Sequence, residues 1–486
     1  MDILFINPGD RKKIFQSLGQ NLTSIEPPYL ILSFATYLKN LGYSVGIIDS
    51  NAENVSPEET AQKVVEINPK LIAIIVYGNQ PSASTQNMGI AGRIAREIKK
   101  LNSSLLIVMG GLHPSALPQK TLYEEDIDFV IEGEEQIPLK ELIKTIKTAK
   151  DFNKVPGLWY FEKNKIKKNS KPNLIKNLDE YMLIADWKMI DLKKYRAHNW
   201  HCFDNIKKRS PYAAIYTSLG CPFNCVFCCI NAPFGKHVIR YRNPEIVVQE
   251  LEILNKKYRV RNIKIIDEMF VLHENHYMKI VDLIIKKKLD LNIWCYARVD
   301  TIKETNLKRM KQAGINWLAL GIESANPDIR DGASKKLRVK DIKKIVKMIQ
   351  YSGIRVIGNF IFGLPNDTLE TMEETLEMAR ELNCEFVNFY CAMAYPGSKL
   401  YEIAIKEGWD LPDTWEGYSQ HSYETKPLPT RYLSAMEVLK FRDEAFYQYF
   451  TNPKYLNMIE EKFGDLVKEH IRSFSKIKLK RKILEV

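Results

Sequence analysis

Apolar residues in the first 150 positions gather into short runs that alternate with amphipathic segments. Five runs rich in Ile, Val and Leu have the length of strands: Ile3–Asn7, Ser44–Ile48, Leu71–Tyr77, Leu105–Met109 and Phe129–Glu132. Between them, helical spacing predicts helices over Tyr29–Leu41, Glu58–Ile67, Asn87–Lys100 and Gln136–Thr148, with a short turn near Gln119–Tyr123. Apolar strands separated by helices are typical of buried parallel strands with helical crossovers. Residues 1–150 are therefore expected to form a doubly wound, Rossmann-like α/β domain that binds ligands at the carboxyl ends of its strands.

The same alternation returns over residues 206–408. The predicted strands are Ala213–Ser218, Asn262–Ile266, Asn292–Ala297, Trp317–Leu320, Val356–Phe362 and Phe386–Cys391. Helical stretches separate them: Pro244–Lys257, His276–Lys288, Lys303–Gln312, Val339–Tyr351 and Leu369–Leu382. Six further units are too many for the first sheet, so a second α/β domain is predicted, either a barrel or a partial barrel.

Two segments differ from this pattern. Residues 151–205 are rich in lysine and contain Trp159-Tyr160-Phe161, which predicts a linker with a small β-hairpin. Residues 409–486 show no strand and are expected to form a helical C-terminal domain with helices at Ser434–Tyr449, Pro453–Phe463 and Leu466–Lys480.

Composition and charge narrow the class of protein. Apolar residues make up 45% and charged residues 27% of the 486 residues, as in globular proteins and unlike disordered chains. The beginning of the chain lacks a basic, then apolar, leader and no apolar run is long enough to cross a bilayer, so a cytoplasmic location is expected.

The net charge of +12 comes from basic residues that are spread along the chain, most densely over Arg472–Lys482. This run lacks the aromatic interleaving of nucleic-acid binders, so a solvated helix face is expected and nucleic acid is not favoured. Apolar neighbours such as Ile471 and Phe474 leave two alternatives open: peripheral membrane contact, or docking onto the barrel.

The strongest chemical signal is a cluster of cysteines. All eight cysteines follow position 200, and Cys221, Cys225 and Cys228 form C-x3-C-x2-C directly after a predicted strand. Three thiolates on one loop can hold three irons of a 4Fe–4S cluster and leave the fourth iron open. A structural zinc site normally needs four ligands in two separated pairs. Cys229 is expected to pack rather than ligate, as are the cysteines that stand alone, Cys202, Cys295, Cys384 and Cys391.

With Phe227 as the aromatic residue, this motif resembles the signature of the radical S-adenosylmethionine superfamily. The resemblance implies a partial (βα)6 barrel whose open iron chelates the amino and carboxylate groups of S-adenosylmethionine. An external one-electron reductant of the flavodoxin or ferredoxin type would then drive cleavage to methionine and a 5′-deoxyadenosyl radical.

The resemblance also implies S-adenosylmethionine contacts at strand ends of the barrel, namely Phe227, Glu268, Arg298, Glu323 and Asn359. The commoner Gly-Gly-Glu pattern is replaced by Asp267-Glu268, so only Glu268 is carried over, and a solvated carboxylate is the alternative for Asp267. A salt bridge at the barrel rim is the alternative for Arg298.

Small and polar residues also end the strands of the first domain, without the G-x-G-x-x-G fingerprint of nicotinamide binding. Each could be an ordinary turn, but together and before the cysteine motif they resemble the cobalamin-binding domain of cobalamin-dependent radical S-adenosylmethionine enzymes. The cobalamin contacts implied are Pro28, Tyr77, Ser82, Ser84, Thr85, Gly110, Gly111, His113, Gly133 and Glu134. An Asp-x-His-x-x-Gly motif is absent, so cobalt would have no histidine ligand, and its lower face would be empty, water-bound or capped near Tyr77–Thr85. His113 would position its loop or meet a corrin amide.

The leading hypothesis is methylation of an unactivated carbon of a small-molecule substrate through the 5′-deoxyadenosyl radical and methylcobalamin. Cyclisation or rearrangement with the same cofactors is the alternative enzyme, and a cobalamin- and metal-binding sensor is the alternative of another class. Methylthio transfer is disfavoured because residues 1–201 contain no cysteine. The catalytic residues stay unassigned, and the substrate-contact candidates Asn231, Phe234, His273, Tyr390 and Tyr395 are not ranked.

Overall fold

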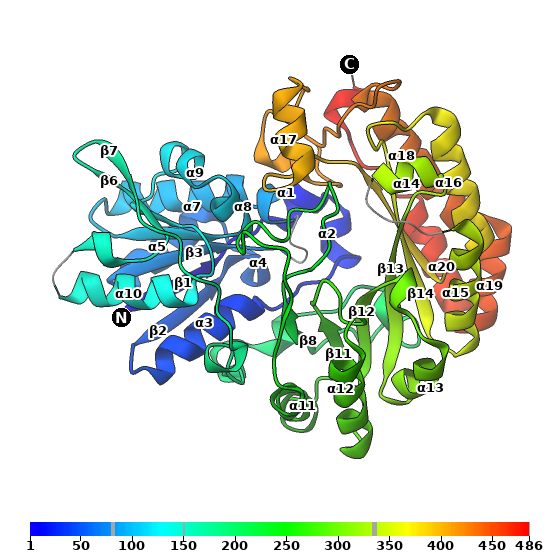
Figure 1. The fold of residues 1–486 in the computed structure, drawn as a ribbon, viewed down its shortest axis with the longest axis horizontal. Helices are drawn as coiled ribbons and strands as arrows, with labels where there is room; N and C mark the ends of the chain where they lie inside the picture. The colour runs from blue at the N-terminus through cyan, green and yellow to red at the C-terminus, as the bar shows by residue number, and fades with distance from the viewer. Residues whose placement is uncertain (79–82, 149–150, 333–337, 486) are drawn as a thin grey trace.

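In the computed structural model, the chain forms two α/β lobes that lie side by side, with the N-terminal lobe on the left of Figure 1 and the second lobe on the right. The structure describes residues 1–78, 83–148, 151–332 and 338–485. Each lobe is built around one sheet, and the predicted fold class, a doubly wound domain followed by a partial barrel and C-terminal helices, is confirmed.

The first sheet has seven strands in the order β2-β1-β3-β4-β5-β6-β7. Their bounds are β1 Ile3–Asn7, β2 Val45–Asp49, β3 Leu71–Val76, β4 Ile107–Gly111, β5 Phe129–Ile131, β6 Leu158–Glu162 and β7 Lys165–Lys168. The first five strands pair in parallel. From β1 the chain passes to β2 on one side and then to β3, β4 and β5 on the other side, as expected for a doubly wound sheet. The hairpin β6–β7, predicted at Trp159-Tyr160-Phe161, continues the sheet in antiparallel pairing.

Helices cover both faces of this sheet. Apolar side chains of α3 (Tyr29–Asn40) and α10 (Gln136–Lys147) pack against one face. Those of α5 (Pro57–Ile67) and α7 (Met88–Leu101) pack against the other. The strands are buried on both faces, which explains their continuous apolar runs.

The second sheet has six parallel strands in the order β15-β14-β13-β12-β11-β8. Their bounds are β8 Tyr212–Ile215, β11 Asn262–Ile265, β12 Asn292–Arg298, β13 Ile315–Glu323, β14 Arg355–Phe362 and β15 Phe386–Cys391. Since β8 and β15 are the edges and do not pair, the barrel is partial. The helices between strands are α11 Pro244–Glu252, α12 Glu274–Lys286, α13 Glu304–Gln312, α15 Val339–Tyr351 and α16 Leu369–Leu382.

Three C-terminal helices pack on the outside of the barrel beside β15, at the right edge of Figure 1. They are α18 Ala435–Phe450, α19 Pro453–Phe463 and α20 Asp465–Ser475. The hydroxyl of Tyr449 donates to the carbonyl of Cys384 over 2.7 Å, which ties α18 to the chain two residues before β15. Ile471 and Phe474 of α20 are buried in the hydrophobic core that the barrel strands and these helices share, so α20 docks onto the barrel.

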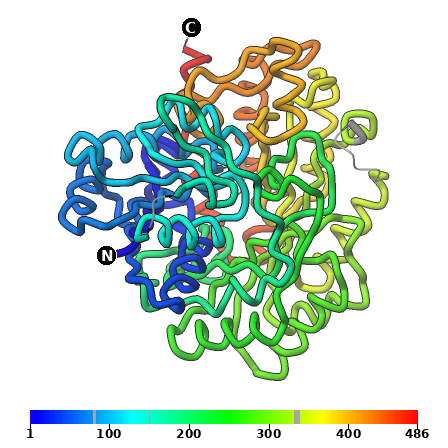
Figure 2. Tube along the Cα trace, turned by 60° about the vertical axis from the view of Figure 1, so that its left-hand side comes forward, coloured from blue at the N-terminus to red at the C-terminus, as the bar shows by residue number. Residues whose placement is uncertain are grey.

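The basic C-terminal run does not form the predicted solvated helix face. Helix α20 ends at Ser475, and the chain returns toward the top of both views (Figures 1 and 2). Arg481 is buried and its Nε lies 2.9 Å from Asp443 Oδ2, while Lys482 pairs with Glu424. Five of the six basic residues of the run are exposed as predicted, namely Arg472, Lys476, Lys478, Lys480 and Lys482. The prediction was wrong in the length of the helix and at Arg481, because the sequence does not reveal that Asp443, 38 residues away, is its partner.

Several short elements gave no sequence signal. Helices α1 (Arg11–Phe15) and α2 (Leu18–Asn21) follow β1 and lie between the two lobes (Figure 1). No described helix combines the length and the apolarity needed to cross a lipid bilayer.

Candidate functional site

A cavity of about 540 Å³ lies between the lobes and is lined by the carboxyl ends of strands from both sheets. Asn7 and Tyr77 line it from the first sheet, and Arg298, Glu323 and Tyr390 from the second. Ligand sites in both folds form at this edge of a parallel sheet. The arrangement therefore lets ligands held by the two lobes meet in one cavity.

The loop with the cysteine motif forms part of the cavity wall, and Cys221, Cys225 and Cys228 all line it. Backbone bonds fold this loop: the Cys228 amide donates to the Cys225 carbonyl over 3.0 Å, and Leu400 donates to Val226 over 2.7 Å. Within the described residues, no three His, Cys, Asp or Glu side chains converge on a point that could hold a single metal ion. A 4Fe–4S cluster does not need this convergence, because each of its thiolates binds a different iron.

The remaining cysteines pack as predicted. Cys229 is buried in an apolar cluster with Leu112, Ile230 and Met269. Four further cysteines are buried in or beside the barrel core: Cys202, Cys295, Cys384 and Cys391.

Asp267 and Glu268 are neighbours in the sequence but have different surroundings. Asp267 is buried and accepts hydrogen bonds from the Thr217 amide, the Thr217 hydroxyl and the Ser218 hydroxyl, over 2.5–2.6 Å. It holds the chain after β8, so the alternative of a solvated carboxylate is wrong. Glu268 lines the cavity, and its buried Oε1 has no hydrogen-bond partner among the described residues. Burial raises the pKa of Glu268 to about 8.

Arg298 stands at the end of β12 and forms the salt bridge that was the alternative to a ligand contact. It forms a bidentate pair with Asp300 at 2.9 and 2.8 Å, which is the predicted salt bridge at the barrel rim. Its guanidinium carbon also lies 3.9 Å from the ring centre of Phe223 on the cysteine loop. Arg298 lines the cavity, and its buried Nη1 has no hydrogen-bond partner in the described part of the chain.

Glu323 ends β13 with a backbone φ of 68°, an unfavourable conformation for a residue with a Cβ. The register between β13 and β14 shifts at this point. Strained residues of this kind concentrate at ligand sites, and Glu323 lines the cavity. Asn359 and Phe227 line it as well, and Asn359 accepts a bond from Asn388 over 2.9 Å.

On the side of the first lobe, Pro28 and Tyr77 line the cavity, whereas the other predicted cobalamin residues that the structure describes do not. The Tyr77 hydroxyl donates to Glu135 over 3.1 Å. Burial raises the pKa of Glu135 to about 8. Glu134 instead pairs with Arg240 at 2.8 Å and accepts the Ile175 amide, so it links the first lobe to the linker and to β10 (Arg240–Tyr241).

Ser84, Thr85 and His113 join the ends of β3 and β4. The Ser84 hydroxyl accepts the His113 amide over 3.0 Å, and Thr85 lies 3.2 Å from His113 Nδ1. The His113 ring packs edge-on against Trp415 at 4.4 Å. These bonds agree with the expectation that His113 positions its loop. Ser82 lies outside the described residues.

The three glycines predicted to approach a cofactor are confined by protein atoms. Gly111 has a φ of 123°, and a Cβ there would lie 2.3 Å from the Val76 carbonyl oxygen. A Cβ on Gly110 would meet Glu135 at 3.0 Å, and one on Gly133 would meet Lys171 at 3.4 Å.

Sequence reasoning missed part of the cavity wall. Arg11, Gln420, His421 and Arg442 line the cavity, yet they come from a short helix and from the segment beyond the barrel. None belongs to a motif, so only the tertiary structure could reveal them. Among the unranked substrate-contact candidates, Tyr390 and Tyr395 line this cavity and Asn231, Phe234 and His273 do not.

Comparison with known proteins agrees with this architecture. The model of the radical SAM superfamily matches residues 215–379, and that of the B12 binding domain matches residues 17–143. The chain is 30% identical to an uncharacterized methyltransferase, PH0819, of Pyrococcus horikoshii over 98% of both chains. It is 26% identical to the anaerobic magnesium-protoporphyrin IX monomethyl ester cyclase of Rubrivivax gelatinosus, over 93% of this chain and 80% of the relative.

Solved structures share the fold. The radical S-adenosylmethionine methyltransferase TsrM of Kitasatospora setae, solved with cobalamin and a [4Fe-4S] cluster, matches with a TM-score of 0.71 and 17% identity over 93% of this chain and 90% of that one. The cobalamin-dependent enzyme OxsB matches with a TM-score of 0.68 and 16% identity over 97% of this chain and 70% of that one.

The two lobes, the cysteine loop and the shared cavity define an enzyme of the radical S-adenosylmethionine class. The chain belongs to the branch of this superfamily that carries a B12 binding domain, and the Pyrococcus methyltransferase is a relative along nearly its whole length.

Proposed function

We propose that this enzyme transfers a methyl group to a carbon atom of a small-molecule substrate, using a 4Fe–4S cluster, S-adenosylmethionine and cobalamin. The observation that carries the proposal is the single cavity, which is lined both by the three motif cysteines and by Tyr77 and Pro28 of the cobalamin-binding lobe. When bound, the cluster and S-adenosylmethionine supply a carbon-centred radical, and cobalamin supplies the methyl group.

The residues of the barrel fit the proposed cofactors. Cys221, Cys225 and Cys228 provide three thiolates and no fourth ligand, as an open cluster requires. The unpartnered atoms Glu268 Oε1 and Arg298 Nη1 provide one acceptor and one donor in the same wall, matching the ammonium and carboxylate groups of the methionine moiety. Buried polar atoms without partners are costly, so a ligand that satisfies both is favoured.

On the side of the first lobe, Tyr77 and Pro28 line the cavity. Gly110 and Gly111 allow the ends of the neighbouring strands to pack closely. We assign to Ser84, Thr85 and His113 the positioning of the loop that supports cobalamin rather than direct contact with it. Their mutual bonds and their absence from the cavity lining support this assignment.

The test is anaerobic reconstitution with iron, sulfide and cobalamin, followed by reduction with titanium citrate and addition of S-adenosylmethionine. We expect about four irons per chain and formation of both 5′-deoxyadenosine and S-adenosylhomocysteine. A Cys225→Ala variant should lose the cluster and 5′-deoxyadenosine, whereas Cys202→Ala, a buried cysteine outside the loop, serves as the control. Absence of both products from a fully loaded enzyme would refute the proposal.

Cyclisation is the second candidate, because a cyclase matches over 93% of this chain. Both reactions consume S-adenosylmethionine to form 5′-deoxyadenosine, but only methylation also releases S-adenosylhomocysteine. Formation of 5′-deoxyadenosine alone would favour cyclisation. In either case a flavodoxin- or ferredoxin-type reductant is the proposed electron donor.

The substrate itself is left open by these relatives. Besides the magnesium-protoporphyrin ester cyclase, the relatives include a cytidylyl-2-hydroxyethylphosphonate methyltransferase and a hopanoid C-3 methylase. The compounds in these names differ in charge, size and polarity. The lining of the cavity is therefore the better guide to the substrate class.

A further inference from the structure

One wall of the cavity is basic and is not used by the cofactor residues above. Residues 7–15 and 420–446 contribute Asn7, Pro8, Gly9, Arg11, Ile14, Phe15, Gln420, His421, Arg442 and Phe446 to the lining. These residues include two arginines and no aspartate or glutamate. The carboxylates that line the cavity, Glu26, Glu268 and Glu323, come from the loop before α3 and from the barrel strand ends.

Four of these side chains follow one another along the wall. Arg11 and Phe15 are four residues apart on α1 and therefore share a helix face. The ring of Phe15 lies 5.9 Å from the ring of His421. Arg481 donates to the Gln420 carbonyl over 3.2 Å and contacts Asp443, the partner of Arg442, so the segment that carries His421 lies beside Arg442.

Two buried nitrogen atoms in this wall lack partners. Arg11 Nη1 and His421 Nδ1 have no hydrogen-bond partner among the described residues, although Arg11 Nη2 contacts Asn54 over 3.3 Å. Burial beside two guanidinium groups holds the pKa of His421 well below its ordinary value, so its ring is neutral at pH 7. A ligand group that satisfies these nitrogens would remove the cost of leaving them unpaired.

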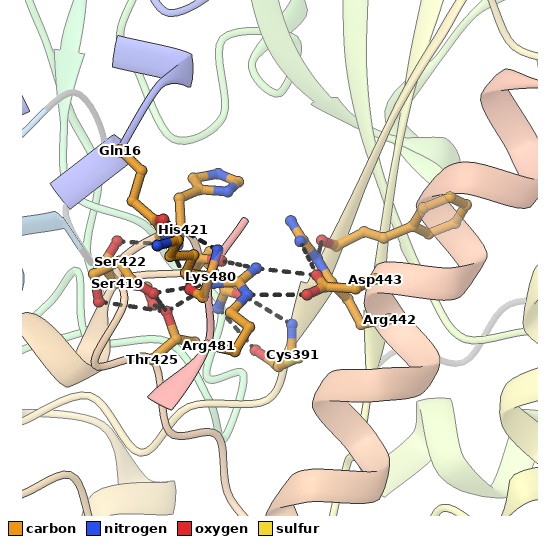
Figure 3. Close-up of polar contacts among 12 residues, drawn as sticks. Gln16, Cys391, Ser419, His421, Ser422, Thr425, Arg442, Asp443, Lys480 and Arg481 are labelled. Carbon is orange, nitrogen blue, oxygen red and sulfur yellow. Dashed lines mark hydrogen bonds and ion pairs between the residues drawn. The ribbon is translucent and has the colours of Figure 1, made fainter. Parts of the chain in front are cut away.

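The charge beside His421 is not balanced. Asp443 lies between Arg442 and Arg481 (Figure 3), with contacts of 2.6 Å to Arg442 and 2.9 Å to Arg481. One carboxylate thus serves two guanidinium groups and leaves an excess positive charge. Arg11 interacts with Asp49, but that carboxylate already accepts bonds from Asn7, Ala52 and Tyr195.

The wall is also held in place before any ligand binds. Arg442 Nε donates to the Phe389 carbonyl over 2.8 Å, and Gln16 donates to the His421 carbonyl over 2.8 Å. Figure 3 shows Gln16 reaching from α1 to the segment that carries His421. A preorganised donor set loses little entropy when a ligand binds.

From these observations we infer that the wall formed by Arg11, His421 and Arg442 binds an anionic group, a carboxylate or a phosphate, of the substrate. The rest of the substrate would face the apolar lining that Ile361, Phe389 and Phe446 provide. The inference rests on the proposed function in that it names the substrate class of the same cavity.

The test is equilibrium dialysis of two probes with the same ring system against the holoenzyme loaded with cluster and cobalamin. Anilinonaphthalene sulfonate is an anion, and phenylnaphthylamine is its neutral counterpart. Because a hydrogen bond to a charged group contributes about 1.5–3 kcal/mol, Arg11→Gln and Arg442→Gln should each weaken binding of the anion by about tenfold or more. Binding of the neutral probe should be unchanged, and Arg442→Lys should retain most of the affinity for the anion.

Arg96→Gln is the matched control, because Arg96 is exposed and pairs with Asp126 on the surface of the first lobe. Equal losses for both probes, or none for the anion in either variant, would overturn the inference. Competition with phenyl phosphate and with phenylacetate then distinguishes a phosphate from a carboxylate preference, and equal displacement by neutral phenylethanol would count against both. No assay of methyl transfer is needed, so failure of the proposed function would be seen separately.

The phosphate of the cobalamin nucleotide has the same chemistry, and a further titration separates it from the substrate. Hydroxocobalamin is titrated into the cluster-loaded variants and followed by its absorbance. Unchanged affinity in Arg11→Gln and Arg442→Gln assigns the wall to the substrate. A tenfold loss of cobalamin affinity would assign it to the cofactor and overturn the inference.

Discussion

At the scale of single residues, two glutamates that are neighbours in the sequence lie in different surroundings, which the residue type alone does not reveal. Glu134 is neutralised by Arg240, whereas Glu135 is fully buried and receives a hydrogen bond from neutral Tyr77. The family resemblance indicated Glu134 as a cobalamin contact. A sequence motif gives residue types but not the directions in which their side chains point. Glu268 was carried over from a motif in the same way, and its orphaned oxygen in the cavity supports that choice.

Glu135 should make stability depend on pH. Its pKa of about 8 in the folded state lies above the usual value because burial disfavours the charged form. The stability that it contributes is fully present below about pH 4.5 and is lost as the pH rises from there to about 8, because over this range the unfolded chain releases the proton that the folded state keeps. Between pH 5 and 9 the cofactor-free wild type should lose stability relative to Glu135→Gln by a few kcal/mol, as measured by urea unfolding.

The substitution Glu141→Gln, at a partly exposed position on the same helix, controls for the loss of one carboxylate. Parallel pH profiles for wild type and Glu135→Gln would show that Glu135 is not protonated in the fold.

At the scale of elements, the strap formed by residues 476–485 fastens the wall of the cavity. Arg481 contacts Asp443, the carbonyls of Gln420 and Ser422, and the hydroxyl of Thr425. Removing one partner of a buried ion pair costs about 3–5 kcal/mol. We expect Arg481→Ala to lower the free energy of unfolding by about this amount and to expose residues 416–425 to proteases. Lys478→Ala, at an exposed position of the same strap, should change neither.

Elements with strong periodicity could be predicted, and elements made by tertiary contacts could not. Every predicted strand of both sheets appears, because apolar runs report burial directly. Helix α20 ends five residues before the predicted end at Lys480, and α1 was not predicted. The bounds of both helices depend on tertiary contacts, such as the bond between Gln16 and Lys480. For the same reason, the sequence predicted cavity residues at the strand ends but not those on α1 or on residues 420–446.

At the scale of the whole molecule, buried polar pairs fix one lobe against the other. Tyr29 of α3 donates to Glu250 over 3.0 Å, and Arg242 pairs with Glu250 at 2.9 Å with both side chains fully buried. A second pair joins Glu26 to Lys264 of β11 at 3.0 Å. Glu250→Gln leaves a buried guanidinium without its counter-charge, so it should lower stability by about 3–5 kcal/mol and separate the calorimetric unfolding of the lobes.

The nearby substitution Glu252→Gln removes a carboxylate that faces solvent and pairs with Lys256, so a single cooperative transition is expected there. A single unshifted transition for Glu250→Gln would mean that apolar packing alone couples the lobes.

The bonds between Gln16 and Lys480 join positions separated by 464 residues in the chain. During synthesis, the N-terminal lobe can fold as a unit long before residues 420–446 and the strap leave the ribosome. The cavity wall therefore closes at a late stage of translation, after the cysteine loop and both sheets exist.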